Sequence, residues 1–327
     1  MKGFNMRWVA TRCLALLLVA GFGAPTHAQE FPTKEIRIVI GFAAGTGVDV
    51  IARFFANKLQ PLAGKPVIVE SKVGAIGNIG AEAVARARPD GYTMLVAPGN
   101  STMASNPHLF KKLPFDPAKD FAPVSPLLRL AFTFGVAPNS PIKSMQELVA
   151  HLKAKGDKAS YGVSGPFQTV SGHLFKTVTG TKATAVRYRS TPDIHRDLLA
   201  GLLDYMIADA PYTLAPAKEG RLRLLAVASA ERSSVAPDLP GMREAGVPNF
   251  DLSSWFGAWL PANTPPEIVA KINKWYTTIL SQEDSKAFIK SIGAEPFPGS
   301  PEVLRAHTVS ETAKWGKLIR DAGIQPQ

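Results

Sequence analysis

Cysteine is almost absent from this sequence. Cys13 is the only one in 327 residues, and it lies in the N-terminal segment. A chain with one cysteine has no intramolecular disulfide and no cysteine-rich metal site, so burial of apolar side chains must hold it together. Beyond that segment no apolar run approaches about 18 residues, which excludes a membrane-spanning helix from the rest of the chain.

Signatures of metal and nucleic-acid binding are also lacking. The six histidines are scattered, without an H-x-x-x-H pair. His195 with Asp193 and Asp197 is better explained as part of a solvated helix face than as a metal site. The formal net charge is +11, but no basic run exceeds Lys111-Lys112. We therefore predict no metal, no cofactor and no nucleic-acid partner.

The N-terminus has the features of a secretory signal. Lys2, Arg7 and Arg12 precede an apolar run from Cys13, and a small residue, Ala28, ends the segment. Residues 1–28 are thus the expected signal peptide. The mature chain is expected outside the cytoplasm.

The stretch from Ile36 to Phe55 predicts an anion-binding loop. Ile36–Ile40 is typical of a buried strand, small residues follow, and helical periodicity begins at Val48. The unpaired N–H groups and the dipole of the helix start suit a carboxylate or phosphate. The predicted ligand-binding residues of this loop are Phe42, Ala43, Ala44, Gly45 and Thr46. Val50 replaces the third glycine of a dinucleotide fingerprint, and no Lys-Ser/Thr follows the loop, so neither nucleotide motif is present.

Two further residues of this half have alternative interpretations. Asp49 follows Thr46 at the spacing of a capping box, and we favour helix capping over direct contact with a ligand. Ser101 follows the predicted strand 92–97. Its hydroxyl either faces the anion-binding loop or caps the next helix.

Alternating strands and helices predict an α/β fold with two lobes, each an open, mostly parallel sheet flanked by helices. One series of strands runs to residue 97, a long strand is expected over 127–137, and a second series follows. The last three helices have no strands of their own, so they are expected to return to the first sheet. The chain would then cross twice, near 126–134 and 252–261. The predicted boundaries are 29–128 with 256–327 for lobe 1, and 129–255 for lobe 2.

Polar residues also follow the predicted strands of the second lobe. The candidate ligand-binding residues there are Ser164, Phe167, Gln168, Thr169, Ser190, Thr191 and Asp209. The segment Gly162–Pro166 approximates the hydrolase elbow G-x-S-x-G but ends in proline, so Ser164 is better interpreted as a hydrogen-bond donor to a ligand. Trp255, near the second crossing, is either core or a stacking surface.

Several ordered motifs together resemble the Bug (TctC-like) substrate-binding receptors of tripartite tricarboxylate transporters. The resemblance runs from about Phe31 to Gly323. Its most specific parts are Phe42-x-Ala44-Gly45-x-x-x-Asp49, Gly77-Asn78-Ile79-Gly80-Ala81-Glu82, Pro89-Asp90-Gly91-Tyr92-Thr93, Leu113-Pro114-Phe115-Asp116-Pro117 and Glu244-Ala245-Gly246-Val247-Pro248.

The resemblance implies a periplasmic-binding-protein fold (type II, Venus-flytrap) with two crossover strands as a hinge, and no enzymatic activity. In that family the loop after the first strand and its counterpart in the second lobe close over one ligand carboxylate, mostly through backbone amides and ordered water. The sequence departs from the family at Gly41, Ala43 and Thr46, and in the segments 164–169 and 188–190. The ligand therefore stays open among di- or tricarboxylates, amino-acid-like acids and aromatic acids.

The expected partners are a small organic carboxylate and the membrane permease subunits of such a transporter, and the receptor is expected to be a monomer. The residues alone leave two alternative functions open. One is an exported hydrolase using Ser164, and the other is a ligand-sensing receptor that serves a membrane kinase.

Overall fold

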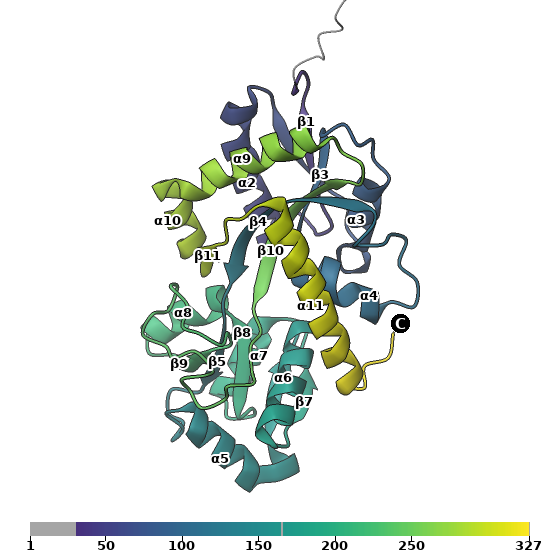
Figure 1. Ribbon diagram of the computed structural model, residues 1–327. Helices are drawn as coiled ribbons and strands as arrows, with labels where there is room; N and C mark the ends of the chain where they lie inside the picture. Colours follow the sequence, from purple (N-terminus) through teal and green to yellow (C-terminus); the bar gives the residue numbers. More distant parts are fainter. Residues whose placement is uncertain (1–30, 165, 327) are drawn as a thin grey trace, which may run out of the picture. The chain divides into compact units, whose positions relative to one another are not determined.

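The computed structural model describes residues 31–164 and 166–326, so the predicted signal peptide lies outside the described residues. All helices and strands belong to one unit that begins at Lys34, and Figure 1 shows their order along the chain. Within the described part of the chain, no helix combines the length and apolar character needed to cross a bilayer.

The first lobe is built on a six-stranded sheet with the order β11-β4-β10-β3-β1-β2. Its strands are β1 (Ile36–Ile40), β2 (Val67–Ser71), β3 (Thr93–Pro98), β4 (Phe121–Leu130), β10 (Ser254–Pro261) and β11 (Ala294–Pro296). β1 pairs in parallel with β2 and β3, as the alternating pattern predicts. β10 and β11 pair antiparallel with their neighbours, so the sheet is mixed.

The second lobe is built on a five-stranded sheet with the order β7-β6-β8-β5-β9. Its strands are β5 (Phe132–Val136), β6 (Ser160–Val163), β7 (Thr184–Arg187), β8 (Tyr205–Asp209) and β9 (Arg223–Val227). β6 is parallel to β7 and β8, whereas β5 is antiparallel to β8 and β9. The antiparallel strand β5 is the one that arrives from the other lobe.

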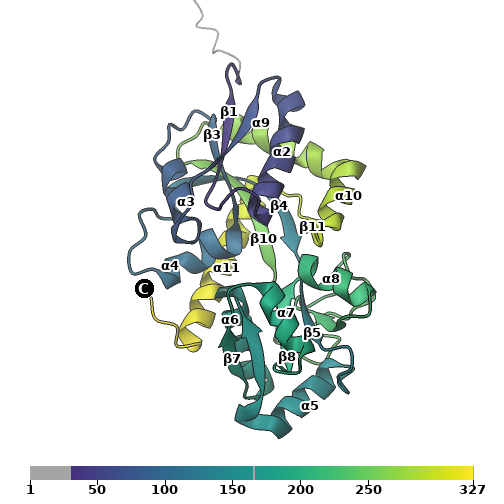
Figure 2. The ribbon, with the colours of Figure 1, turned by 180° about the vertical axis from the view of Figure 1, so that it is seen from behind.

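Helices flank both sheets (Figures 1 and 2). In the first lobe they are α2 (Gly47–Ala63), η1 (Ala75–Gly77), α3 (Asn78–Ala85), η2 (Asn100–Ser105), α4 (Asn106–Leu109), α9 (Pro266–Ser281), α10 (Glu283–Ser291) and α11 (Pro301–Asp321). In the second lobe they are α5 (Met145–Lys155), η3 (Gly156–Lys158), α6 (Pro166–Thr179), α7 (Thr191–Leu199) and α8 (Ala210–Lys218). α2 buries Ile51, Phe55 and Leu59, which recur at helical spacing on one face.

The chain crosses between the sheets at two places, as predicted. The first crossing differs in detail, because the single strand expected over 127–137 is two strands that meet at Ala131. The N–H of Ala131 donates to the carbonyl of Gly293 at 3.3 Å, and its own carbonyl accepts from the N–H of Ala210 at 2.8 Å. Ala131 thus lies between β4 and β5 and belongs to neither strand. The second crossing leads from the buried Leu252 into β10.

The C-terminal helix α11 contacts both lobes. It packs on β4 and η2 of the first lobe, and its last turns reach α6 of the second (Figures 1 and 2). Trp315, Leu318 and Ile319 are buried in the main cluster of the second lobe. The prediction that the last three helices return to the first sheet is therefore only partly correct for α11, because this helix also packs in the second lobe.

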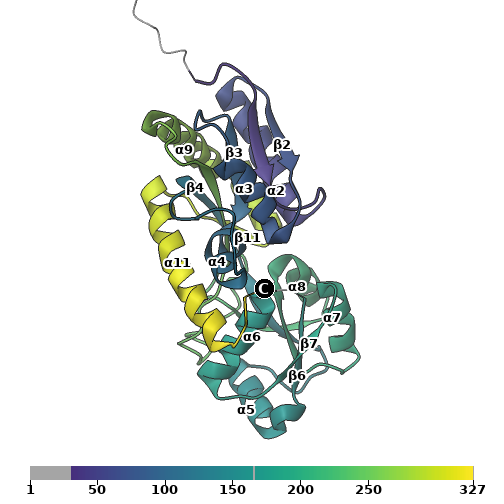
Figure 3. The ribbon, with the colours of Figure 1, turned by 90° about the vertical axis from the view of Figure 1, so that its right-hand side faces the viewer.

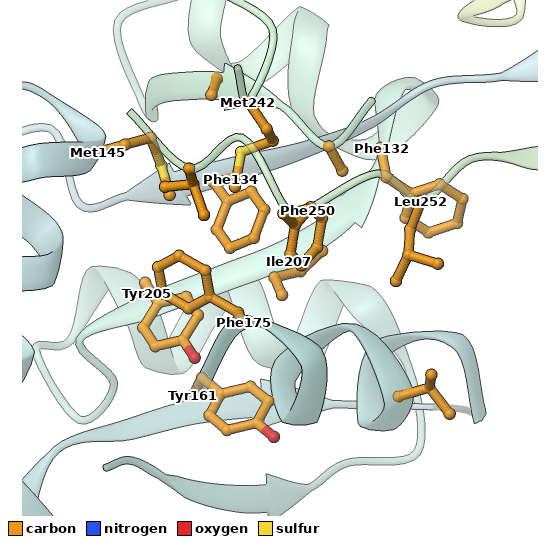
Figure 4. Packing of buried hydrophobic residues seen from close by; sticks show 14 of the residues in the cluster. Phe132, Phe134, Met145, Tyr161, Phe175, Tyr205, Ile207, Met242, Phe250 and Leu252 are labelled. Carbon is orange, nitrogen blue, oxygen red and sulfur yellow. The ribbon is translucent and has the colours of Figure 1, made fainter. Parts of the chain in front are cut away.

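Aromatic residues form the centre of the second lobe (Figure 4). The ring of Phe134 on β5 lies 4.9 Å from that of Phe175 on α6 and 5.4 Å from that of Phe250, between ring centroids. Tyr161 and Tyr205 stack at 5.1 Å on the neighbouring strands. Close packing of this kind resists deformation, so it supports the loops at the edge of the sheet.

Candidate functional site

The strand directions place the two sets of predicted loops on facing edges of the sheets. β10 pairs antiparallel with both β4 and β3, so β4 and β3 run in the same direction. β1 pairs in parallel with β3 and therefore runs in that direction too. β4 leads into the second lobe, so the carboxyl ends of β1 and β3 point toward that lobe. β8 and β6 run opposite to β5, so their carboxyl ends point back toward the first lobe. α2 follows β1, α8 follows β8, and α7 follows β7, which is parallel to β6. Figure 3 shows these three helices on one side of the molecule.

The loop after β1 is held by the side chains of Asp49 and Thr46. Asp49 accepts a hydrogen bond from the N–H of Gly45 at 2.9 Å and another from Nε of Arg53 at 3.0 Å. Thr46 Oγ1 donates to the carbonyl of Ala43 at 2.7 Å and makes no capping bond. The bond from Arg53, followed by that from Gly45, lowers the pKa of the Asp49 carboxyl. Asp49 therefore stabilises the helix start, as the capping interpretation predicts, but through Gly45 and not Thr46, while its contact with a ligand stays a prediction.

This arrangement leaves main-chain donors at the start of α2. Among the described residues, no acceptor is found for the N–H of Ala43, Ala44 or Gly47. All three residues are exposed. Unpaired N–H groups at a helix N-terminus, reinforced by the helix dipole, favour an anion.

A second loop, which the sequence prediction missed, supports the first. A Cβ on Gly41 would lie 2.3 Å from Cα of Gly77, and one on Gly80 would lie 2.8 Å from Cα of Gly41. The loop after β2 is strained, because Ala75 and Ile76 have φ of 48° and 54°. The Gly-x-x-Gly spacing in the sequence could have predicted this loop, because glycines allow two backbones to approach closely.

A π-helical turn follows β3 where a loop was expected. Ser101 lies within this turn, and its Oγ donates to the carbonyl of Pro98 at 3.3 Å. The caps of η2 and α4 are Gly99 and Ser105, so Ser101 caps neither helix. Ser101 is half-buried at the carboxyl end of β3, and its contact with a ligand stays a prediction.

Three predicted residues of the second lobe come together. Ser164 Oγ lies 3.4 Å from Thr191 Oγ1 and 3.4 Å from Nε2 of Gln168. They arrive from the end of β6, the start of α7 and the first turn of α6, because parallel strands end at the same edge. Together they offer hydroxyl and amide groups to a polar ligand.

The other predicted residues of the second lobe have different surroundings. Ser190 caps α7: its Oγ donates to Asp193 Oδ2 at 2.7 Å and accepts from the N–H of Asp193 at 3.4 Å. The ring of Phe167 stacks on Phe132 with centroids 3.8 Å apart, which places it in the core. Thr169 lies in the first turn of α6, as Phe167 does.

Asp209 ends β8 and begins α8 without a side-chain capping bond. Burial raises the pKa of its carboxyl. Burial disfavours the charged form of this carboxyl, so a hydrogen-bond donor on a ligand would stabilise its carboxylate. Trp255, by contrast, is fully buried against Trp259 and His307 and belongs to the core.

The His195 cluster has ordinary structural partners. Asp193 pairs with Arg196 at 3.1 Å, and Asp197 accepts from Tyr188 Oη at 2.9 Å. Among residues 31–164 and 166–326, no group of three His, Cys, Asp or Glu residues is arranged to hold a metal ion.

Comparison with known proteins gives a consistent result. The family model described as tripartite tricarboxylate transporter family receptor matches residues 51–324. A protein of Bordetella bronchiseptica, described as a UPF0065 protein, is 35% identical over 319 residues, which cover 97% of this chain and 94% of that protein.

Two solved structures from Rhodopseudomonas palustris are also similar. A protein solved with adipate is 34% identical, with a TM-score of 0.77, over 91% of this chain and 100% of the other. MatC, with bound malate, is 29% identical, with a TM-score of 0.72, over 88% of this chain and 100% of the other. These likenesses confirm the predicted fold class and the family resemblance.

Proposed function

We propose that this chain, which belongs to the tripartite tricarboxylate transporter receptor family, captures a small carboxylate between its two lobes and delivers it to the permease of such a transporter. Its family and its structural neighbours are solute-binding receptors and not enzymes. The periplasmic location of solved relatives supports the same location here. That the protein acts as a monomer is part of the proposal. The observation that carries the proposal is the set of unpaired N–H groups at the start of α2.

One carboxylate of the ligand would meet the N–H groups of Ala43, Ala44 and Gly47. The positive end of the α2 dipole adds to this attraction, and Asp49 keeps the loop in place without presenting a free charge, since Arg53 neutralises it. The remainder of the ligand would meet the second lobe as the lobes close. Closure is driven by the ligand's higher affinity for the closed form.

The second lobe favours a polar ligand body. Ser164, Gln168 and Thr191 offer donors and acceptors, and Asp209 offers a carboxyl group of raised pKa. Because Phe167 packs in the core, the argument for an aromatic acid is weakened. The related proteins solved with adipate and malate support an aliphatic di- or hydroxycarboxylate.

The hydrolase alternative is not supported by the surroundings of Ser164. Its Oγ contacts a threonine hydroxyl and a glutamine amide, and neither is a general base. The sensor alternative uses the same binding site as transport. Uptake of the identified acid by cells with and without the permease separates the two.

Isothermal titration with mono-, di- and tricarboxylates tests the proposal. We expect a dicarboxylate to bind with one-to-one stoichiometry, and the Thr191→Val variant to bind it about tenfold more weakly, as the loss of a hydrogen bond predicts. The Ser291→Ala variant is the matched control, because the Ser291 hydroxyl bonds only locally to Phe288. Absence of binding by every acid, or equal affinity in all three proteins, contradicts the proposal.

A further inference from the structure

Glu295 on β11 joins the two lobes behind the crossing strands. Its Oε2 accepts hydrogen bonds from Ser234 Oγ at 3.0 Å, from the N–H of Ser234 at 3.3 Å and from Ser233 Oγ at 3.4 Å. β11 is the edge strand of the first sheet, while Ser233 and Ser234 follow β9, the edge strand of the second. The carboxylate of one lobe is thus bound by the other.

Glu295 also has a partner in its own lobe. It stands directly opposite Arg129 in the antiparallel pairing of β11 with β4. Side chains in such positions have Cβ atoms about 4.5–5.5 Å apart, so the two charges are within reach. Within the described chain Arg129 makes no ion pair, and its guanidinium lies 3.8 Å from the centre of the Phe297 ring. The carboxylate therefore has donors on two sides, Ser233 and Ser234 in the second lobe and Arg129 in its own lobe.

The two side chains have room to change partners. Both line a cavity of about 310 Å³ between the crossing segments, the loop after β9 and α11. The other charged residues of this cavity are already paired. Glu311 bonds Lys314 at 2.9 Å, and Glu231 bonds Arg243 at 2.8 Å within the second lobe.

The position of Glu295 gives this exchange a mechanical effect. In the first sheet, β4 and β10 lie between β11 and the strands that carry the anion-binding loop. In the second sheet, β5 lies between β9 and the strands β8 and β6. A rotation about the crossing strands that brings the ligand loops together therefore separates Glu295 from Ser233 and Ser234.

We propose that Glu295 is a positioning residue that sets ligand affinity without touching the ligand. Bound to Ser233 and Ser234, it stabilises the arrangement with the ligand loops apart. Paired with Arg129, it stabilises the closed arrangement. The effect on affinity rests on the proposed function, because the apparent dissociation constant falls as the closed fraction rises.

Variants with opposite expected effects test this proposal. Removing the serine hydroxyls, in a Ser233→Ala, Ser234→Ala double variant, should raise the affinity for a bound dicarboxylate about threefold to tenfold, because a lost hydrogen bond shifts a two-state equilibrium by that factor. Arg129→Met should lower the affinity by a similar factor. Glu231→Gln is the matched control, since Glu231 lines the same cavity but pairs only within its lobe. Changes of the same sign in the first two variants, or an equal change in the control, would overturn the proposal.

A second measurement needs no ligand. Spin labels at Asn57→Cys on α2 and Tyr212→Cys on α8, both exposed positions, report the separation of the lobes once Cys13 is replaced by serine. Without ligand, the distribution of distances between the two labels should move toward shorter values in the Ser233→Ala, Ser234→Ala variant than in the parent. An unchanged distribution refutes the role of Glu295 even if a carboxylate binds. A shortened distribution without any carboxylate binding refutes the proposed function alone.

Discussion

The contact between Gly41 and Gly77 allows a quantitative prediction. In a Gly41→Ala variant the new methyl group would lie 2.3 Å from Cα and 2.6 Å from the carbonyl oxygen of Gly77. Both contacts are with main chain, so no side-chain rotation relieves them. The loop after β1 or the loop after β2 must move, and with it the N–H groups proposed to bind the carboxylate.

The cost of this change follows from the packing. Overpacking a close contact typically destabilises a protein by about 1–3 kcal/mol, and a clash with main-chain atoms, which cannot rotate away, belongs at the upper end. At about 2 °C per kcal/mol for a chain of this size, the melting temperature should fall by about 6 °C. The affinity for a dicarboxylate should fall at least about tenfold, because misplaced donors lose their hydrogen bonds.

Gly47→Ala is the matched control for stability. Gly47 is the first residue of α2, directly after the same loop, but a Cβ there meets nothing within 4 Å, and its φ is not positive. Its free energy of unfolding should stay within about 0.5 kcal/mol of the parent. Thermal unfolding followed by circular dichroism measures both variants. Equal melting temperatures for Gly41→Ala and Gly47→Ala would refute the argument from backbone contact.

Three further predictions follow from side-chain surroundings. Asp49→Asn should weaken carboxylate binding, measured by calorimetry, because the N–H of Gly45 loses a charged acceptor. Burial alone would raise the pKa of Asp204, but hydrogen bonds from Lys155 and neighbouring donors lower it below its ordinary 3.8. The contribution of the Asp204 carboxylate to the free energy of unfolding is therefore complete above about pH 4 and is lost as the pH falls through the lowered pKa. The free energy of unfolding of Asp204→Asn should therefore fall less steeply than that of the parent as the solution is acidified. Burial raises the pKa of Tyr161 to about 12, so Tyr161→Phe should remove only a late step from an absorbance titration of tyrosinate.

The elements near the anion-binding loop were predictable from the sequence because local patterns determine them. The run Ile36–Ile40 is apolar at nearly every position, and Phe55 and Leu59 recur at helical spacing. The distance of Asp49 from Thr46 predicted a role at the helix start, although its carboxylate accepts from the N–H of Gly45 instead. The gathering of Ser164 and Thr191 followed from the rule that parallel strands end at one edge.

Other features depend on tertiary contacts that no local pattern reports. β11 has three residues and ends in proline, and it exists because β4 offers a free edge. The break at Ala131 arises because Gly293 and Ala210 take its hydrogen bonds. Phe167 and Gln168 are adjacent in sequence, yet one packs in the core and the other reaches Ser164, because neighbouring positions of a helix face different directions.

The central claim is that main-chain N–H groups at the start of α2 bind a carboxylate, and nuclear magnetic resonance tests it most directly. The N–H signals of Ala43, Ala44 and Gly47 are followed while the ¹⁵N-labelled protein is titrated to saturation with a dicarboxylate that binds by calorimetry. New hydrogen bonds to a carboxylate should move these signals to lower field. The shifts should give the same dissociation constant as the calorimetric titration. Saturated binding that leaves all three signals unmoved would contradict the account.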